Sequence, residues 1–266
     1  MVRHHAIDHW VQHPGGRIFA TQWVPEPTAR AGVPIVLLHD SLGCVELWRD
    51  FPSALSERTG RRVIAYDRWG FGRSDPRADR PSIDFIAEEA REHFPSLREQ
   101  LELDRFVALG HSVGGAMALE IGAAMPDACE AVITIAAQVF AEDRTLEGIR
   151  AAKDNFAQPA QLQRLVRYHG TRAPWVLDAW THVWLDPEFS RWTLASVLPR
   201  IECPVLAIHG DQDEFGSVAH PHMIQRLVPR AAIHLLPGIG HVPQRENAGL
   251  ILSLIEKFLG SRPLTA

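Results

Sequence analysis

The segment VALGHSVGGAMALE, residues 107–120, decides the fold. The apolar residues before its first glycine predict a strand, and the apolar spacing after its last glycine predicts a helix. Between them stands Ser112, with Gly110 two residues before it and Gly114 two residues after it. The chain therefore passes from strand to helix with no loop and places a hydroxyl at the turn.

Such a turn forces its central residue into a strained backbone conformation, with positive φ, and needs small neighbours because the backbones pass close together. It also aims the Ser112 hydroxyl at the positive end of the following helix, where unpaired N–H groups collect. This arrangement suits a nucleophile whose attack creates an oxyanion. The alternative is a serine that only caps the helix beside two packing glycines. In the setting of strand, turn and helix we favour the nucleophile.

Strand and helix signals alternate along most of the chain, which predicts a mostly parallel, doubly wound α/β sheet of about eight strands. A hairpin of HWVQH and GGRIFATQW opens the chain. Further strands are expected at 33–39, 62–67, 105–110, 130–139, 203–210 and 232–238, and helices at 47–60, 82–103, 112–125, 218–228 and 245–260.

The alternation fails between residues 140 and 200, where only helical patterns occur. We expect a helical cap at 140–200, inserted after the sixth strand into a core of residues 1–139 and 201–266. A cap at this point covers the edge of the sheet where open α/β folds bind ligands. We assign its Trp175, Trp180, Trp184 and His182 to a substrate pocket, although the tryptophans, Trp192 included, are equally explained as packing between cap and core.

A serine nucleophile needs a base, and the base needs an orienting acid. In a sheet of this topology the expected chain order is serine, acid, histidine. The segment GDQDEFG supplies two candidate acids, and we choose Asp213 because Asp211 immediately follows a strand and resembles a turn residue. The segment GIGHVP then presents His241 after the last strand. Ser112, Asp213 and His241 are therefore predicted to meet at one edge of the sheet.

With these segments in order, the chain resembles the α/β-hydrolase fold superfamily, in its serine hydrolase branch with a helical cap. The matching motifs are LLHDSLG, YDRWGFGRSD, GHSVGG, GDQDEFG and GIGHVP. The resemblance implies an oxyanion hole made by the backbone N–H groups of Val113 and Ser41, with Leu42 as the alternative to Ser41. The usual His-Gly of the first motif is replaced by His39-Asp40. We expect the Asp40 carboxylate to face away from the oxyanion and to hold the loop by hydrogen bonds.

We predict a serine hydrolase that cleaves a carboxylic ester or a related acyl compound through an acyl-enzyme. Lactonases, thioesterases, carbon–carbon bond hydrolases and perhydrolases share the same triad and remain alternatives. Dehalogenases and epoxide hydrolases of the family carry a carboxylate in place of the serine. A small-molecule receptor that retains the triad is the alternative from outside the enzymes.

Composition excludes several other classes. The chain has 266 residues, is 46% hydrophobic and carries a net charge of −5, which offers no basic field for nucleic acid. It lacks both a signal-peptide pattern at its start and an apolar run of membrane-spanning length, so we expect no membrane partner. The chain has only three cysteines, too few and too uneven for a framework of disulfides, which favours a reducing compartment. We therefore expect the cytoplasm. We expect a small-molecule substrate, no cofactor and no metal, since His220 and His222 lack a third ligand. Monomer and homodimer remain open.

Overall fold

The computed structural model describes residues 5–25 and 32–260, and the strands of this part form one eight-stranded sheet. The strands are β1 (His5–His13), β2 (Gly16–Val24), β3 (Ile35–Leu38), β4 (Val63–Tyr66), β5 (Phe106–His111), β6 (Cys129–Ile135), β7 (Val205–Gly210) and β8 (Ala231–Leu236). Their order across the sheet is β1-β2-β4-β3-β5-β6-β7-β8. The hairpin pairs antiparallel and joins β4 antiparallel, and every later pairing is parallel. The predicted fold class is confirmed.

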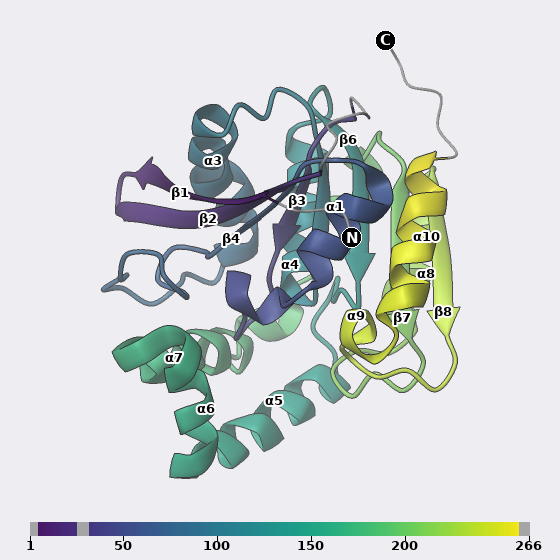
Figure 1. The fold of residues 1–266 in the computed structure, drawn as a ribbon. Coiled ribbons are helices and arrows are strands. Elements are labelled where there is room, and N and C mark those ends of the chain that lie inside the picture. The colour runs from purple at the N-terminus through teal and green to yellow at the C-terminus, as the bar shows by residue number, and fades with distance from the viewer. Residues whose placement is uncertain (1–4, 26–31, 261–266) are drawn as a thin grey trace.

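Helices cover both faces of this sheet (Figure 1), because the central strands are buried on both sides. One face packs against α2 (Phe85–Glu88), α3 (Phe94–Gln100), α4 (Val113–Ala124) and α8 (Ala219–Leu227), and the other against α1 (Phe51–Thr59) and α10 (Ala248–Gly260). Shorter turns are η1 (Val45–Trp48), η3 (Gly170–Arg172), η4 (Phe189–Arg191), η5 (Leu198–Arg200) and α9 (Pro243–Glu246).

The helix expected at 82–103 is interrupted. A π-helical turn, η2 (Glu89–His93), separates α2 from α3. Pro95 has no N–H with which to continue the α-helical ladder, which accounts for the irregular turn just before it.

Between β6 and β7 the chain leaves the sheet and forms α5 (Asp143–Phe156), α6 (Pro159–His169) and α7 (Ala173–Trp184). These helices lie beyond the carboxyl ends of the parallel strands (Figure 1). An isolated antiparallel bridge between Phe140 and Thr193 brings the two ends of this segment together. None of the described helices has the length and apolar character needed to cross a membrane.

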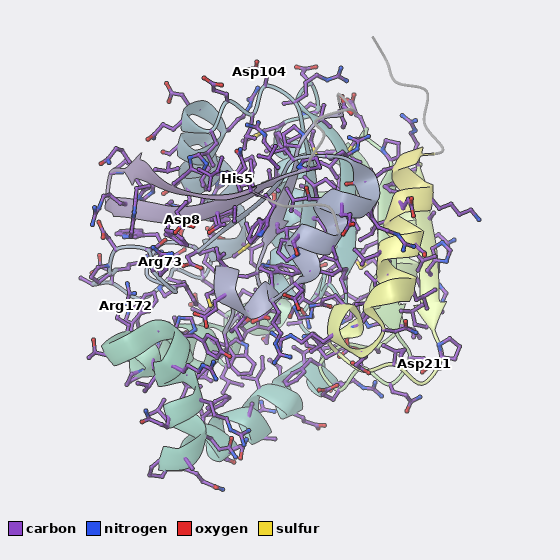
Figure 2. All side chains as sticks on the ribbon, viewed as in Figure 1. His5, Asp8, Arg73, Asp104, Arg172 and Asp211 are labelled. Carbon is purple, nitrogen blue, oxygen red and sulfur yellow. The ribbon has the colours of Figure 1, made fainter. Side chains whose placement is uncertain are left out.

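The loop after β4 holds these helices against the sheet. The Gly72 N–H donates to Nδ1 of His169 at 3.0 Å, and Nε2 of His169 donates to the Leu42 carbonyl at 3.0 Å. Arg172, the last residue of η3 (labelled in Figure 2), donates to the carbonyls of Gly72 and Ser74. The glycine-rich segment RWGFGRSD is thus a docking point for the insert.

Candidate active site

The turn at Ser112 has the predicted geometry. Ser112 has φ 56° and ψ −126°, between the end of β5 and the start of α4. A Cβ on Gly110 would overlap the carbonyl of Gly114, and a Cβ on Gly114 would overlap the carbonyl of Leu38. Only glycine allows strand and helix to approach this closely. The strained backbone therefore raises the serine above the edge of the sheet.

His241 lies between the serine and a carboxylate. Its Nε2 is 3.0 Å from Oγ of Ser112, and its Nδ1 is 2.9 Å from both carboxylate oxygens of Asp213. A ring whose Nδ1 faces a carboxylate carries its hydrogen there and leaves Nε2 free to accept one from the serine. The structure therefore brings together the three residues predicted from sequence, in the arrangement that activates a hydroxyl.

Asp213 is buried and fully engaged. Its Oδ1 accepts the N–H groups of Phe215 at 2.7 Å and Gly216 at 3.0 Å, and its Oδ2 lies 3.4 Å from Nε2 of His209. Burial alone raises the pKa of this carboxyl, but the hydrogen bond and charge of His241, together with His209 and the Phe215 N–H, outweigh it and lower the pKa. Asp213 therefore remains ionised while it orients His241.

Asp211 lies outside this cluster, in the turn directly after β7 (labelled in Figure 2). It is exposed, and its Oδ1 accepts the Gly238 N–H at 2.7 Å. This contact ties two turns together, as expected of a turn residue.

The loop of residues 39–43, for which the sequence predicts an oxyanion-binding N–H group and which is called the oxyanion loop below, differs in how its two candidate N–H groups are engaged. The N–H of Leu42 donates to Oδ1 of Asp40 at 2.9 Å, and the N–H of Gly43 donates to the Asp40 carbonyl at 3.2 Å. The N–H of Ser41 has no acceptor among the described residues. Val113 is the first residue of α4, so its N–H has no partner within the helix. Of the two candidates in this loop, the geometry favours Ser41 over Leu42.

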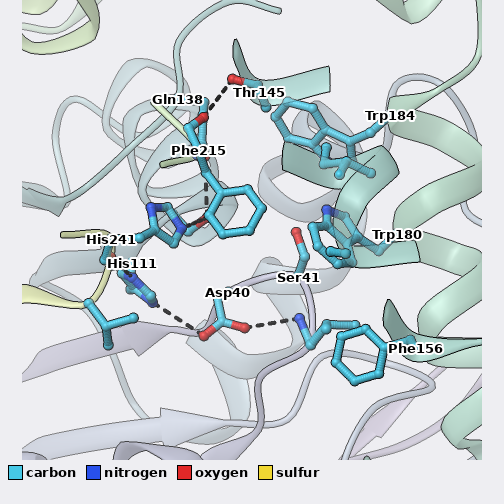
Figure 3. Close-up of a pocket in the computed structure, with 15 residues that line it drawn as sticks. Asp40, Ser41, His111, Gln138, Thr145, Phe156, Trp180, Trp184, Phe215 and His241 are labelled. Atoms are coloured by element: carbon cyan, nitrogen blue, oxygen red, sulfur yellow. Dashed lines mark hydrogen bonds and ion pairs between the residues drawn. The ribbon is translucent and has the colours of Figure 1, made fainter. Parts of the chain in front are cut away.

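Asp40 points its carboxylate toward β5. Its Oδ2 lies 3.2 Å from Nδ1 of His111, and its Oδ1 takes the Leu42 N–H (Figure 3). Burial by itself raises the pKa of Asp40, but the hydrogen bond and charge of His111, with further contributions from His39 and the Leu42 N–H, hold it well below the usual aspartate value. Contacts with His111 and with the Leu42 N–H thus stabilise the Asp40 carboxylate, as the sequence predicted.

A cavity of about 210 Å³ is lined by Ser112 and by side chains of α5 and α7 (Figure 3 shows its lining). Two polar side chains of the lining contact Oγ of Ser112, and the lining also includes apolar and aromatic side chains. The lining residues are Asp40, Ser41, Leu42, His111, Ser112, Gln138, Thr145, Ile149, Ala152, Phe156, Trp180, Trp184, Phe215, His241 and Val242. The volume is below the range of about 300–1,000 Å³ typical of drug-sized ligands, so the cavity fits a small molecule.

Two residues predicted for the pocket lie elsewhere. Trp175 packs against Phe71 and covers Gly70, and it belongs to the contact that docks the insert. His182 is exposed on α7. Trp180 and Trp184 line the cavity. Helical periodicity reveals the residues that share a face, but it does not reveal which face meets the sheet and which meets the cavity.

Sequence reasoning missed several residues of the cavity wall, among them Gln138 and Phe215. Gln138 is 2% exposed, and its Oε1 lies 3.3 Å from Oγ of Ser112. The Phe215 ring lies 4.9 Å from the ring of His241. A polar side chain just beyond the end of a central strand was the signal for Gln138, since parallel strands end at the ligand-binding edge.

No group of three or more histidine, cysteine or acidic side chains is placed to hold a metal ion in residues 5–25 and 32–260. His220 is buried, with Nε2 3.0 Å from Glu142 and Nδ1 accepting the Val139 N–H at 3.2 Å. His222 is exposed. The His220 ring therefore links the start of the insert to α8.

Known proteins share this sequence pattern and fold. Residues 33–248 match the model of the alpha/beta hydrolase fold family. The chain is 26% identical over 254 residues to 2-hydroxy-6-oxo-2,4-heptadienoate hydrolase of Pseudomonas putida, covering 87% of this chain and 90% of that one. It is 27% identical over 245 residues to serine hydrolase BPHL of Homo sapiens, covering 88% and 81%.

Among solved structures, proline iminopeptidase of Mycobacterium smegmatis superposes with a TM-score of 0.72 at 22% identity, covering 96% of this chain and 98% of that chain. The similarity of fold extends over nearly the whole length, and the family match includes the elbow, the acid loop and the histidine loop. This chain is a hydrolase that belongs to the alpha/beta hydrolase fold family.

Proposed function

We propose that this protein hydrolyses small, uncharged carboxylic esters through an acyl-enzyme formed on Ser112. The observation that carries the proposal is the hydrogen-bonded series from Ser112 through His241 to Asp213, with distances of 3.0 and 2.9 Å. Its position at the floor of an apolar cavity supports a small-molecule substrate.

In the proposed reaction, Oγ of Ser112 attacks the ester carbonyl carbon while Nε2 of His241 takes the hydroxyl proton. The Asp213 carboxylate stabilises the imidazolium that forms. The backbone N–H groups of Val113 and Ser41 stabilise the oxyanion, and each such donor typically contributes about 10²–10³ in rate. His241 then returns its proton to the leaving alcohol. A water molecule, deprotonated by the same histidine, releases the acid.

The uncharged substrate is inferred from the charges that face the cavity. Its lining, all within the described residues, includes neither lysine nor arginine. Its one carboxylate, Asp40, is already paired with His111. A buried anionic group on the substrate would therefore have no lysine or arginine to pair with, and His111 is already engaged by Asp40. Burying an unpaired charge is costly. As part of this proposal, residues 140–200 act as the cap that excludes water and selects the acyl group.

Carbon–carbon bond hydrolysis is the second candidate, because relatives at 25–26% identity are named 2-hydroxy-6-oxo-2,4-heptadienoate hydrolase and 2-hydroxymuconate semialdehyde hydrolase. The substrate in the first of these names is a carboxylate. The absence of lysine and arginine from the described cavity lining favours the ester over this candidate.

A matched pair of substrates tests the proposal. p-Nitrophenyl 4-methylpentanoate and the p-nitrophenyl monoester of succinate have acyl groups of nearly the same shape, one ending in an isopropyl group and the other in a carboxylate. We expect kcat/KM to be about 100-fold higher for the neutral ester, since an unpaired buried charge costs about 3 kcal/mol or more.

Parallel assays measure kcat/KM for 2-hydroxy-6-oxo-2,4-heptadienoate, a lactone and a thioester. These values are compared with kcat/KM for the neutral ester. Equal or faster turnover of the charged ester would exclude the proposed selectivity. A dienoate rate above every ester rate would replace the ester assignment with carbon–carbon bond hydrolysis.

A second prediction concerns the aromatic wall. Trp180→Ala removes a half-buried side chain from the cavity and should raise KM about tenfold for the preferred ester, or shift the preferred acyl length upward, while kcat changes less. Trp10→Ala, in the edge strand β1, is the matched loss of a tryptophan far from the cavity. Steady-state kinetics across acyl lengths measures both, and identical profiles for the two variants would show that Trp180 does not contact substrate.

A further inference from the structure

His111, which precedes the elbow serine, connects two loops. Its Nδ1 lies 3.2 Å from Oδ2 of Asp40 in the oxyanion loop, and its Nε2 lies 2.8 Å from the carbonyl oxygen of His241. The His111 side chain is 3% exposed and its ring lies 5.2 Å from the ring of His241. One buried imidazole thus touches both the loop that supplies the oxyanion N–H and the loop that supplies the base.

The two contacts fix the number of protons on the ring. A carbonyl oxygen only accepts hydrogen bonds, so Nε2 carries a hydrogen that it donates to His241. A carboxylate also only accepts, so Nδ1 carries a second hydrogen that it donates to Asp40. A neutral ring has one N–H and would leave a lone pair facing one of these oxygens. The low pKa of Asp40 agrees with the proton residing on the imidazole.

We propose that Asp40 and a doubly protonated His111 form a positioning bridge that holds the His241 loop in register with the oxyanion loop. Neither residue exchanges a proton with the substrate in this role. The bridge explains why an aspartate occupies the place of the usual glycine after His39: its Oδ1 secures the Leu42 N–H and its Oδ2 secures the imidazolium. The role rests on the proposed function, in which His241 is the general base.

The other charged or titratable groups around the bridge already have partners. His39 donates from Nδ1 to the Asp40 carbonyl at 2.7 Å and accepts the Arg68 N–H at Nε2, and burial holds its pKa well below the usual value. Burial raises the pKa of Cys44 to about 12. Arg68 donates to the Asp40 carbonyl, and Arg245 donates to the Leu47 carbonyl. His241, the remaining neighbour of the bridge, is held by Asp213.

Loss of the bridge has a defined consequence. Without the hydrogen bond from His111 to the His241 carbonyl, the His241 loop is free to shift relative to Ser112. A displacement of about 1 Å at a reacting centre can cost about 10²-fold in rate. We therefore expect substitutions that break this link to slow the reaction of Ser112.

Two substitutions separate the two contacts. His111→Gln places an amide N–H near the position of Nε2 and retains the link to His241, whereas His111→Asn places one near Nδ1 and retains only the link to Asp40. We measure the rate at which a small fluorophosphonate labels Ser112, at one pH, in the wild type, both variants, Asp40→Asn and the Asp40→Asn/His111→Asn double variant. Labelling depends on the serine and its base but not on the natural substrate.

His111→Asn should label Ser112 about 10- to 100-fold more slowly, and His111→Gln should recover most of that loss. The double variant should be no slower than the slower single variant, because both disrupt one bridge. In steady-state ester assays kcat should fall while KM stays nearly constant. Melting temperatures report whether each variant is folded.

Nitrogen NMR of histidine-labelled protein gives a readout independent of activity. The His111 signals, assigned by their loss in His111→Gln, should show two protonated ring nitrogens at neutral pH. One protonated and one unprotonated nitrogen would overturn the bridge, as would a labelling rate in His111→Asn equal to that of the wild type. A wild type that resists labelling at Ser112, with the doubly protonated ring present, would contradict the proposed function and leave the bridge in place.

Discussion

Ser112→Ala should lower kcat for the preferred ester by about 10⁶-fold, since loss of a triad nucleophile removes nearly all of the chemistry that the triad performs together. The substitution deletes one hydroxyl whose contacts are His241 and Gln138. Alanine fits the same backbone, so the melting temperature should stay close to that of the wild type. Steady-state kinetics and a thermal melt on the same preparation decide the outcome.

Ser196→Ala, an exposed serine before η5, provides the matched control and should retain full activity. Mass spectrometry after treatment with an organophosphate should add the reagent mass to the peptide that contains Ser112, and only in proteins that carry the serine. Activity within tenfold of the wild type in Ser112→Ala, or inactivation accompanied by labelling of another peptide, would assign the nucleophile elsewhere.

Asp213→Asn should lower kcat by about 10⁴-fold in a folded protein. The Phe215 and Gly216 N–H groups both donate to Oδ1, so the asparagine oxygen takes that position and its amide nitrogen faces Nδ1 of His241. A donor at this point favours the opposite tautomer, in which Nε2 carries the hydrogen. His241 then donates to Ser112 and cannot take its proton.

Asp211→Asn is the control, because the same chemical change falls two residues away on an acceptor of the Gly238 N–H. An asparagine oxygen also accepts that bond, so activity should remain and the melting temperature should fall by a few degrees at most. The kcat and melting temperature of both variants are compared. A larger loss of kcat from Asp211→Asn than from Asp213→Asn would move the acid to the other residue.

The backbone features of the site could be predicted because the residue types that produce them are few. A serine between Gly110 and Gly114 at the junction of strand and helix predicts a tight turn with positive φ at the serine. The structure has this turn. Asp213 could be distinguished from Asp211 by its distance past the strand end. The doubly wound sheet follows from strands that are apolar along their whole length and alternate with helices.

The cavity wall could not be predicted to the same depth. Trp175 and Trp180 lie five residues apart on α7, yet one covers Gly70 and the other lines the cavity. Their separation depends on how α7 is rotated, which is set by contacts with distant residues such as Phe71 and Phe215. The contacts of Asp40 were equally hard to predict, because its carboxylate pairs with His111, a residue 71 positions away in the sequence.

The positive φ of Ser112 also limits which nucleophiles this protein can acquire by mutation. A side chain branched at Cβ meets the backbone badly at φ 56°, so threonine is disfavoured there on shape alone, whatever its reactivity. Cysteine and aspartate are unbranched at Cβ and fit the same turn. A single substitution at this position could therefore introduce a thiol or a carboxylate nucleophile. A threonine nucleophile would require a different backbone conformation at the junction of β5 and α4.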